Sequence, residues 1–528
     1  MRSIAPLLVV CFFTAAFAAS NVVVHRMAQY DLPTIGAFGS RSSALSLSLS
    51  PFTFLDADRD VTVDFFTNLT KPGLRVKGYL FLVPSTISSA SRALWKQFEP
   101  ILLQKNTSFP IYFALETPEL RQVYDAVHTG DHTFEKHVFS VRGSPQAVGS
   151  PKTVNIQGWL RGSGSVDLPT IVLAAHYDSF GLVPGMSVGA DRPTSGVTAL
   201  LEISRVLSRI FGEERSRPAY NVLFLLCGGS TLNYAGIQQW AESQRIAKLE
   251  SVLLLDGIAD GSLHVRTVDS TAPRHLTESL SAIAKKMGVQ LSMEKTPMPT
   301  FPARKEEDTP APSRGVAPQP TVFFQNMEEA LLAALPEDSR STSEIVVLSG
   351  FPSSPNSSLP AFLSRADFLD TESDVSLISR NTHMILEALI RQIWPNAASL
   401  IEASDAVPTF HISEEALASW QAFLSGPSGA GRVSPFVDAH HPALVAITKN
   451  MGETLRDVTL QAVATPRSVL FFGPLSRTGS IDLARPYAFH VIVALCVIAY
   501  NAAIFCGFKF LPSLSVVRRL FAQKAGKQ

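Results

Sequence analysis

Cysteine is rare in this 528-residue chain, which contains four. Cys11 lies in an apolar run near the start, and Cys496 and Cys506 lie in another near the end, so Cys227 is the one cysteine between the two runs. A lone thiol cannot form an intramolecular disulfide, which excludes a disulfide-stabilised scaffold for this long middle part. Because Cys227 closes an apolar stretch, we expect it to be a small buried hydrophobic residue.

Charged residues are also scarce, at 17%, where soluble domains typically carry about 25%. The 45 basic residues balance the 45 acidic ones, so there is no electrostatic case for a nucleic-acid partner. The apolar share of 46% argues against extended disorder. A mean hydropathy of +0.17 indicates that part of the chain lies in lipid.

Residues 1–18 are typical of a secretory signal peptide. Arg2 precedes an apolar run over Ile4–Phe17, which closes on a small-x-small pattern ending at Ala18. The alternative is an uncleaved membrane anchor. It is disfavoured because the run is too short to cross about 30 Å of hydrocarbon.

Residues 487–508 form a second apolar run, without a charged side chain. As a helix it would be about 33 Å long, which matches one transmembrane span. The tail at 509–528 is basic with no acidic residue, and basic tails stay cytosolic. The sequence therefore predicts a single-pass type I membrane protein with residues 19–486 in the lumen. Within the span, Asn501 favours contact with a partner helix, because its amide needs hydrogen-bond partners in lipid.

Three sequons fall on the predicted lumenal side and are candidate glycosylation sites: Asn68, Asn106 and Asn356.

The lumenal part divides into three predicted regions. Residues 19–116 indicate a small α/β domain, with strands expected at Val61–Phe66, Gly78–Pro84 and Pro110–Leu115. Residues 117–396 alternate amphipathic helices with continuous apolar runs, which predicts an α/β domain with three αβα layers around a mainly parallel sheet. Its expected strands are Thr170–Ala175, Val222–Cys227, Val252–Leu255, Thr321–Phe324 and Ile345–Leu348. Residues 397–486 are mixed, with a helix expected near 413–424 and a strand near 458–464.

The first of these apolar strands ends in a polar motif. It leads into His176-Tyr-Asp178-Ser179, and Gly189-Ala-Asp191-Arg-Pro-Thr-Ser195-Gly196 follows before a helix. Such sheets build their sites from polar residues at the carboxyl ends of strands. The pattern resembles the M28 family of zinc aminopeptidases, whose segments read H-x-D-S and G-A-D-D-x-x-S-G. The resemblance extends over about residues 150–396 and implies an aminopeptidase-like fold.

The resemblance also implies a set of metal positions. His176 and Asp256 match ligands of one zinc ion, and Asp191 matches the carboxylate that bridges two ions. Asp178 matches a residue that orients the site. The trio of His176, Asp191 and Asp256 could hold one residual zinc with water as the fourth ligand. The alternative, which we favour, is that the three are hydrogen-bonded remnants of the fold and that the protein has no cofactor.

At other positions of the family pattern, this chain lacks the catalytic or metal-binding residue type. Where the family has G-A-E-E, this chain has Gly228-Gly-Ser230-Thr231, so Ser230 replaces the general base and Thr231 replaces a ligand of the second ion. Ser364 stands where the last histidine ligand belongs. A serine hydroxyl is a very poor base, and losing the base costs about 10²–10⁴ in rate. We therefore expect no catalytic residue and a peptidase-like pseudoenzyme. An active membrane-bound zinc aminopeptidase is the alternative.

Further segments resemble one particular group of M28-like proteins. Ala28–Leu32, Ala174–Asp178 with Gly189–Asp191, and Arg380–His383 resemble the nicalin group, which is related to nicastrin. This resemblance implies a non-catalytic subunit of an endoplasmic-reticulum membrane complex, acting near the translocon in biogenesis, assembly and quality control of multipass and multi-subunit membrane proteins. The implied partners are a small polytopic membrane protein, a Nodal-modulator-type lumenal protein, translocon components and client receptor or channel subunits. A cell-surface receptor ectodomain remains a third possibility.

Overall fold

The computed structural model describes most of the chain between residues 20 and 510. The described ranges are 20–32, 36–41, 45–69, 71, 76–129, 136–148, 153–164, 167–212, 217–244, 246–296, 324–352, 373–394, 411–426, 439–464, 469–484 and 487–510. The predicted signal peptide, Asn356, Ser364, residues 321–323 of an expected strand and the tail from 511 onward lie outside them.

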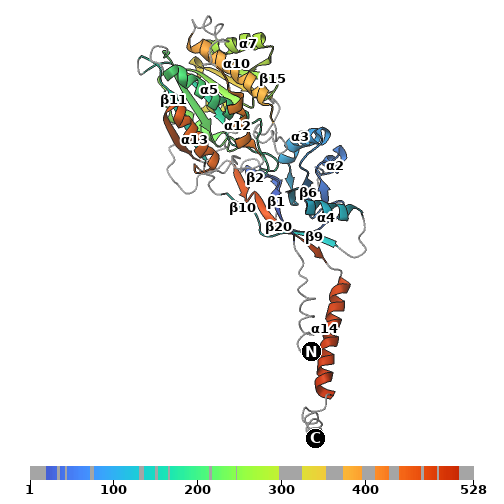
Figure 1. Cartoon of the computed structure of the whole chain (residues 1–528). Helices are drawn as coiled ribbons and strands as arrows, with labels where there is room; N and C mark the ends of the chain where they lie inside the picture. Colours follow the sequence, from blue (N-terminus) through green and yellow to red (C-terminus); the bar gives the residue numbers. More distant parts are fainter. Residues whose placement is uncertain are drawn as a thin grey trace, which may run out of the picture.

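The larger of two α/β bodies contains an eight-stranded sheet in the described part of the chain (Figure 1). Four of the five predicted apolar runs form its central parallel strands. An antiparallel pair extends one side, and β15 and β16 extend the other. The strand order is β16 (Gln290–Thr296), β15 (Ser262–Val268), β17 (Glu344–Ser349), β14 (Leu249–Asp256), β12 (Thr170–His176), β13 (Asn221–Cys227), β11 (Thr153–Leu160) and β18 (Arg456–Val463).

Helices cover both faces of this sheet. Successive residues of β12 point to opposite faces and belong to two different hydrophobic cores. Ile171 and Leu173 join one cluster, and Val172 and Ala174 join the other. The first core is closed by α5 (Thr194–Gly212), α7 (His275–Met287), α10 (Val375–Ile393), α12 (Glu414–Ser425) and α13 (Pro442–Thr454). The second is closed by α6 (Ala235–Ser243) and α8 (Met327–Ala334), with the short α9 (Glu337–Thr342) packed near β14. This is the layered α/β arrangement that the alternating pattern predicted.

The smaller body contains a seven-stranded and a five-stranded sheet among the described residues. The first has the order β4 (Leu45–Ser48), β9 (Lys136–Val141), β20 (Ser476–Ala484), β1 (Ser20–Arg26), β8 (Ile111–Leu115), β6 (Tyr79–Val83) and β5 (Phe54–Asp56). The second has the order β10 (Gln146–Ala147), β19 (Leu470–Gly473), β2 (Gln29–Leu32), β3 (Gly36–Ser40) and β7 (Asn106–Thr107). Because β1 pairs with β20, two strands that lie more than 440 residues apart in the sequence meet in one sheet.

One predicted strand of the smaller body is wrong. Residues 61–66 were expected to be a strand, but α2 (Val63–Leu69) forms there. The Thr62 hydroxyl accepts a hydrogen bond from the Phe65 N–H at 3.1 Å, which caps the helix. Phe66 then packs against Trp95 and Phe98 of α3 (Ser89–Leu103), with ring centroids 4.9 and 4.6 Å apart. A further helix in the described part of this body is α4 (Pro118–Thr129).

Residues 397–486 contribute to both bodies. The expected helix and strand appear as α12 and β18, which pack on the larger body together with α13. The chain then returns through β19 and β20 to the smaller one. The predicted boundaries at 116 and 396 remain predictions, and we note that strands from both sides of them share sheets.

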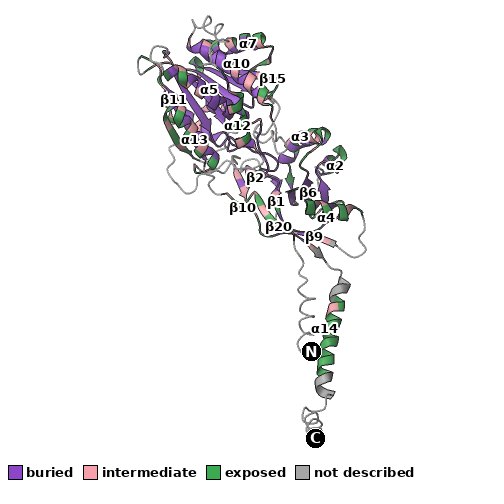
Figure 2. Ribbon diagram, in the orientation of Figure 1, coloured by how far each residue is buried: buried purple, intermediate pink, exposed green. Residues whose placement is uncertain are grey.

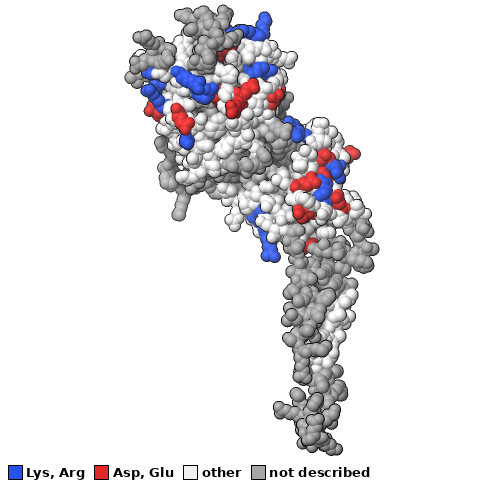
Figure 3. Space-filling model, in the orientation of Figure 1, with Lys and Arg blue, Asp and Glu red and all other residues white. Residues whose placement is uncertain are grey.

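The last described helix, α14 (Tyr487–Phe510), extends away from the two bodies (Figure 1). Its apolar side chains between residues 491 and 505 are exposed, in contrast to the buried cores above it (Figure 2). In the described residues we find no helix that is both long and apolar enough to span a membrane. The span at 487–508 therefore stays a prediction. On the face seen in Figure 3, acidic and basic side chains are interspersed.

Candidate functional site

The predicted site residues gather at one edge of the eight-stranded sheet. His176 ends β12 and Asp256 ends β14, which is the neighbouring parallel strand. Cys227 ends β13 beside His176, and Ser349 ends β17 beside Asp256. Because all four strands are parallel, their carboxyl ends meet at this edge, where doubly wound sheets place their sites.

Asp191 is held at this edge by hydrogen bonds from neighbouring segments. It lies just before α5, and its Oδ1 accepts from the Ser195 hydroxyl at 2.8 Å and from the Ala259 N–H at 2.9 Å. Gly257 makes the close approach possible, with φ of +67° and space so restricted that a Cβ there would lie 3.3 Å from Asp191 Oδ1. These two bonds hold Asp191 Oδ1 in place between α5 and the segment after β14.

Asp256 is engaged by two arginines. Its Oδ1 is in direct contact with Nε of Arg192, the residue that follows Asp191. Its Oδ2 lies 3.7 Å from Nη2 of Arg266 on β15 and accepts a hydrogen bond from the Ser349 hydroxyl at 3.3 Å. Asp256 is 4% exposed, so these cations offset the cost of burying its charge.

Arg266 belongs to a second buried ion pair. Its Nε donates to Glu328 Oε1 of α8 at 2.8 Å, and the two residues are 2% and 1% exposed. Burial lowers the pKa of Arg266, but the charges of Glu328 and Asp256 outweigh that effect and raise it overall. Arg266 therefore stays charged and fixed between two carboxylates.

Asp178 binds the loop that carries Ser230 and Thr231. Its Oδ1 accepts from the Ser230 N–H at 3.1 Å, and its Oδ2 accepts from the N–H and hydroxyl of Thr231 at 3.2 and 3.3 Å. Ser230 and Thr231 thus lie in the loop that follows β13. In the described part of the chain, no histidine or carboxylate is hydrogen-bonded to the Ser230 hydroxyl, so nothing there would activate it as a base.

His176 is buried and neutral at pH 7. Burial, together with the nearby charge of Arg192, lowers its pKa to about 4, against the opposing charges of Asp256 and Asp178. Neutral imidazole could bind a metal, so protonation does not exclude a ligand role.

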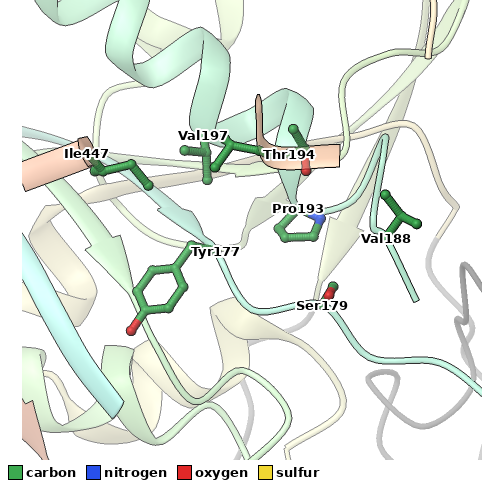
Figure 4. Close-up of a pocket in the computed structure, with 8 residues that line it drawn as sticks. Tyr177, Ser179, Val188, Pro193, Thr194, Val197 and Ile447 are labelled. Atoms are coloured by element: carbon green, nitrogen blue, oxygen red, sulfur yellow. The ribbon is translucent and has the colours of Figure 1, made fainter. Parts of the chain in front are cut away.

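A pocket lies behind this edge (Figure 4). It is small, with a cavity volume of about 10 Å³, which is room for about one water molecule. Its lining combines the two motif loops and α5 with α12 and α13. The lining residues are Tyr177, Ser179, Val188, Pro193, Thr194, Val197, Leu424 and Ile447. This lining is mostly apolar, and none of its side chains is a carboxylate or an imidazole.

The residues present do not fit the zinc ions of M28 aminopeptidases. Of the three predicted ligands, Asp191 accepts two hydrogen bonds at Oδ1, and Asp256 is paired with Arg192 and lies near Arg266. The described residues contain no group of three or more His, Cys, Asp or Glu side chains that could hold a metal ion. Sequence reasoning located the edge of the sheet but missed Arg192, Arg266 and Glu328. An arginine at the second aspartate position of the G-A-D-D segment was the available signal.

The sequence of this chain is similar to those of several known proteins. Residues 155–309 match the model of Peptidase family M28. The BOS complex subunit ncln of Danio rerio is 28% identical over 94% of this chain and 92% of its own length. A nicalin of Caenorhabditis elegans is 44% identical over 19% of this chain and 17% of its own length. The chain is similar to nicalin. This confirms the resemblance expected from the sequence.

The fold comparison agrees with the nicalin similarity. The crystal structure of nicastrin, a gamma-secretase component, superposes with a TM-score of 0.55 and covers 88% of this chain and 99% of nicastrin, at 9% identity. At that identity the likeness shows the fold alone. The fold is therefore mixed α/β, resembling nicastrin, and it contains an M28-like region in a nicalin-like chain.

Proposed function

We propose that the chain is a non-catalytic subunit of an endoplasmic-reticulum membrane complex that acts near the translocon in biogenesis, assembly and quality control of multipass and multi-subunit membrane proteins. The observation that carries this proposal is similarity to a BOS complex subunit over 94% of this chain and 92% of that protein. A match of this extent includes the smaller body, the M28-like region and the C-terminal part together.

Two features support a role without hydrolysis. Ser230 at the base position has no activating partner among the described residues, and loss of a general base costs about 10²–10⁴ in rate. The carboxylate of Asp256 is bound to Arg192 and lies near Arg266, so it does not present free oxygens to a metal that could polarise water.

The membrane topology is part of the proposal. Helix α14 exposes Ile492, Leu495, Ile498 and Phe505, which are 58–66% exposed, and such a surface is stable in lipid rather than in water. The basic tail would then be cytosolic and both sheet-containing bodies lumenal. Asn501 within this helix supports docking on a small polytopic membrane protein, since its amide needs partners there. A Nodal-modulator-type protein and client receptor or channel subunits would contact the lumenal part.

A pulldown in mild detergent tests this assignment. The tagged full-length chain should recover translocon components, a polytopic membrane protein and a large lumenal partner, identified by mass spectrometry. Asn501→Leu should reduce recovery of the polytopic protein, whereas Tyr500→Leu, on the neighbouring exposed position, should not. Recovery of the chain alone, from membranes in which translocon components remain assembled, would count against the proposal.

A further inference from the structure

At the edge of the larger sheet, an arginine side chain lies beside the residues that the M28 pattern assigns to a metal ion. We propose that the guanidinium of Arg192 takes the place of the first metal ion of an M28-type site, so that the domain is charge-balanced and folded without zinc. Arg266 supports it from the other side of the same carboxylate. This inference does not depend on the proposed function, because a complex subunit could be built with or without a metal.

Arg192 lies among the three residues that the M28 pattern assigns to that ion. It directly follows Asp191, its Nε contacts Asp256 Oδ1, and its charge acts on the His176 ring. The side chain is 10% exposed, so the guanidinium is enclosed with them. A cation therefore already stands beside the predicted ligands, and it is covalently part of the chain.

Arg266 lies near the second carboxylate oxygen of Asp256. Its Nη2 lies 3.7 Å from Asp256 Oδ2, and its Nε is bound to Glu328. Two guanidiniums and two carboxylates thus form a buried network across β14, β15 and α8. Networks of this kind are maintained only when each charge has a partner, because a single buried charge is costly.

A zinc ion at this position would conflict with the network. Zinc binds carboxylate oxygen and imidazole nitrogen at about 2.0–2.2 Å, so it would have to displace Arg192 from Asp256. Gly189, in the same loop, has φ of +66°, and a Cβ there would lie 2.6 Å from Pro193. The loop that carries Arg192 is therefore closely packed against itself. Repulsion between the divalent ion and the guanidinium adds to this cost.

The experiment measures zinc content and thermal unfolding of the full-length chain purified in mild detergent. Wild-type protein should hold well below one zinc per chain, and neither added zinc nor a chelator should change its melting temperature. Arg192→Ala should melt about 5 °C or more lower, because Asp256 loses its closest cation. Added zinc should raise the melting temperature of that variant, since the position is then open.

Matched variants make the result specific. In the double variant with His176→Ala and Arg192→Ala the zinc response should disappear, which separates this position from other histidines. Arg192→Lys keeps the positive charge and should show no zinc response, and this variant serves if Arg192→Ala does not fold. Arg59→Ala, at a side chain that is 67% exposed, should leave the melting temperature unchanged.

Three results would overturn the inference. The first is stoichiometric zinc in wild-type protein whose removal lowers the melting temperature. The second is an Arg192→Ala protein that melts like wild type or ignores zinc. The third is an Arg192→Lys protein that responds to zinc as Arg192→Ala does. Any of these leaves the pulldown result untouched, so failure here is distinguishable from failure of the proposed function.

Discussion

Glu202, in the middle of α5, accepts a hydrogen bond from the backbone N–H of Ser413 at 2.6 Å. The same carboxylate is paired with Arg205, whose Nη2 also donates to the His411 carbonyl at 3.0 Å. Ser413 in turn caps α12 through the Ala416 N–H. The segment that leads into α12 is thereby fixed to the helix that begins at the candidate site.

Replacing Glu202 should loosen this junction. Glu202→Ala removes a buried acceptor and leaves the Ser413 N–H and Arg205 without it, so we expect a loss of about 1.5–3 kcal/mol in the free energy of unfolding. Denaturant unfolding of the purified chain measures the loss. Glu453→Ala, at an exposed position of α13, should change the free energy by less than about 0.5 kcal/mol. Equal losses in the two variants would show that the junction has no special role.

Gly257 should be more sensitive to substitution than another glycine with the same backbone conformation. Gly257 and Gly288 have φ of +67° and +69°, so alanine at either position costs about 1–2 kcal/mol in backbone strain. A Cβ at Gly257 would also lie 2.9 Å from the Phe351 ring, whereas nothing lies within 4 Å at Gly288. Overpacking adds about 1–3 kcal/mol for Gly257→Ala. Unfolding free energies of the two alanine variants test the difference, and equal values would contradict the packing at this edge.

The contribution of Asp58 to stability should depend on pH. Hydrogen bonds from the hydroxyl and N–H of Ser88, at 2.6 and 3.0 Å, lower the pKa of Asp58 below its ordinary 3.8. A carboxylate with a lowered pKa stabilises the fold above its unfolded-state pKa, and that contribution is lost as pH falls through the folded-state value. Asp58→Ala should therefore destabilise the chain by about 1 kcal/mol at pH 7.

The measurement is the difference in unfolding free energy between wild type and Asp58→Ala across a pH series. The difference should be constant from pH 7 to about pH 5 and shrink below about pH 4. Asp125→Ala is the control, because that exposed side chain accepts no hydrogen bond in the described structure. If the difference in unfolding free energy grew as the pH fell, the lowered pKa of Asp58 would be contradicted.

Two of the three predicted glycosylation sites are exposed in the structure. Asn68 and Asn106 are exposed, and Arg41 donates to Asn106 Oδ1 at 3.2 Å, which leaves the amide nitrogen as the atom available for glycosylation. We expect each of Asn68→Gln and Asn106→Gln to increase gel mobility by one glycan. Endoglycosidase H should remove the glycans if the protein stays in the endoplasmic reticulum. Unchanged mobility in both variants, or resistance to the enzyme, would contradict the proposed lumenal location and retention.

The central strands were predictable because their apolar runs are continuous. β12, β13, β14 and β17 are buried on both faces, and such strands carry an unbroken series of aliphatic residues. The strand order then places His176 and Asp256 at the same edge, as expected. What the pattern cannot supply is pairing between distant segments, such as that of β1 with β20, because no local signal specifies a strand's partner.

The errors and omissions also have physical causes. Residues 61–66 are rich in β-branched and aromatic side chains, which favours a strand, but the Thr62 cap and the burial of Phe66 favour a helix. Arg192 and Arg266 were missed because their roles come from contacts with Asp256 and Glu328, which are distant in sequence. A charged residue within an apolar segment can belong to a buried ion pair, but the sequence alone does not identify the partner.

The central claim is that a peptidase-like scaffold serves here as a subunit and not as an enzyme. The most direct measurement is hydrolysis of aminoacyl p-nitroanilide substrates by the purified full-length chain, with and without added zinc. The account predicts rates equal to the buffer background in both conditions, and the same background for His176→Ala. Hydrolysis that zinc increases, a chelator removes and His176→Ala abolishes would contradict it.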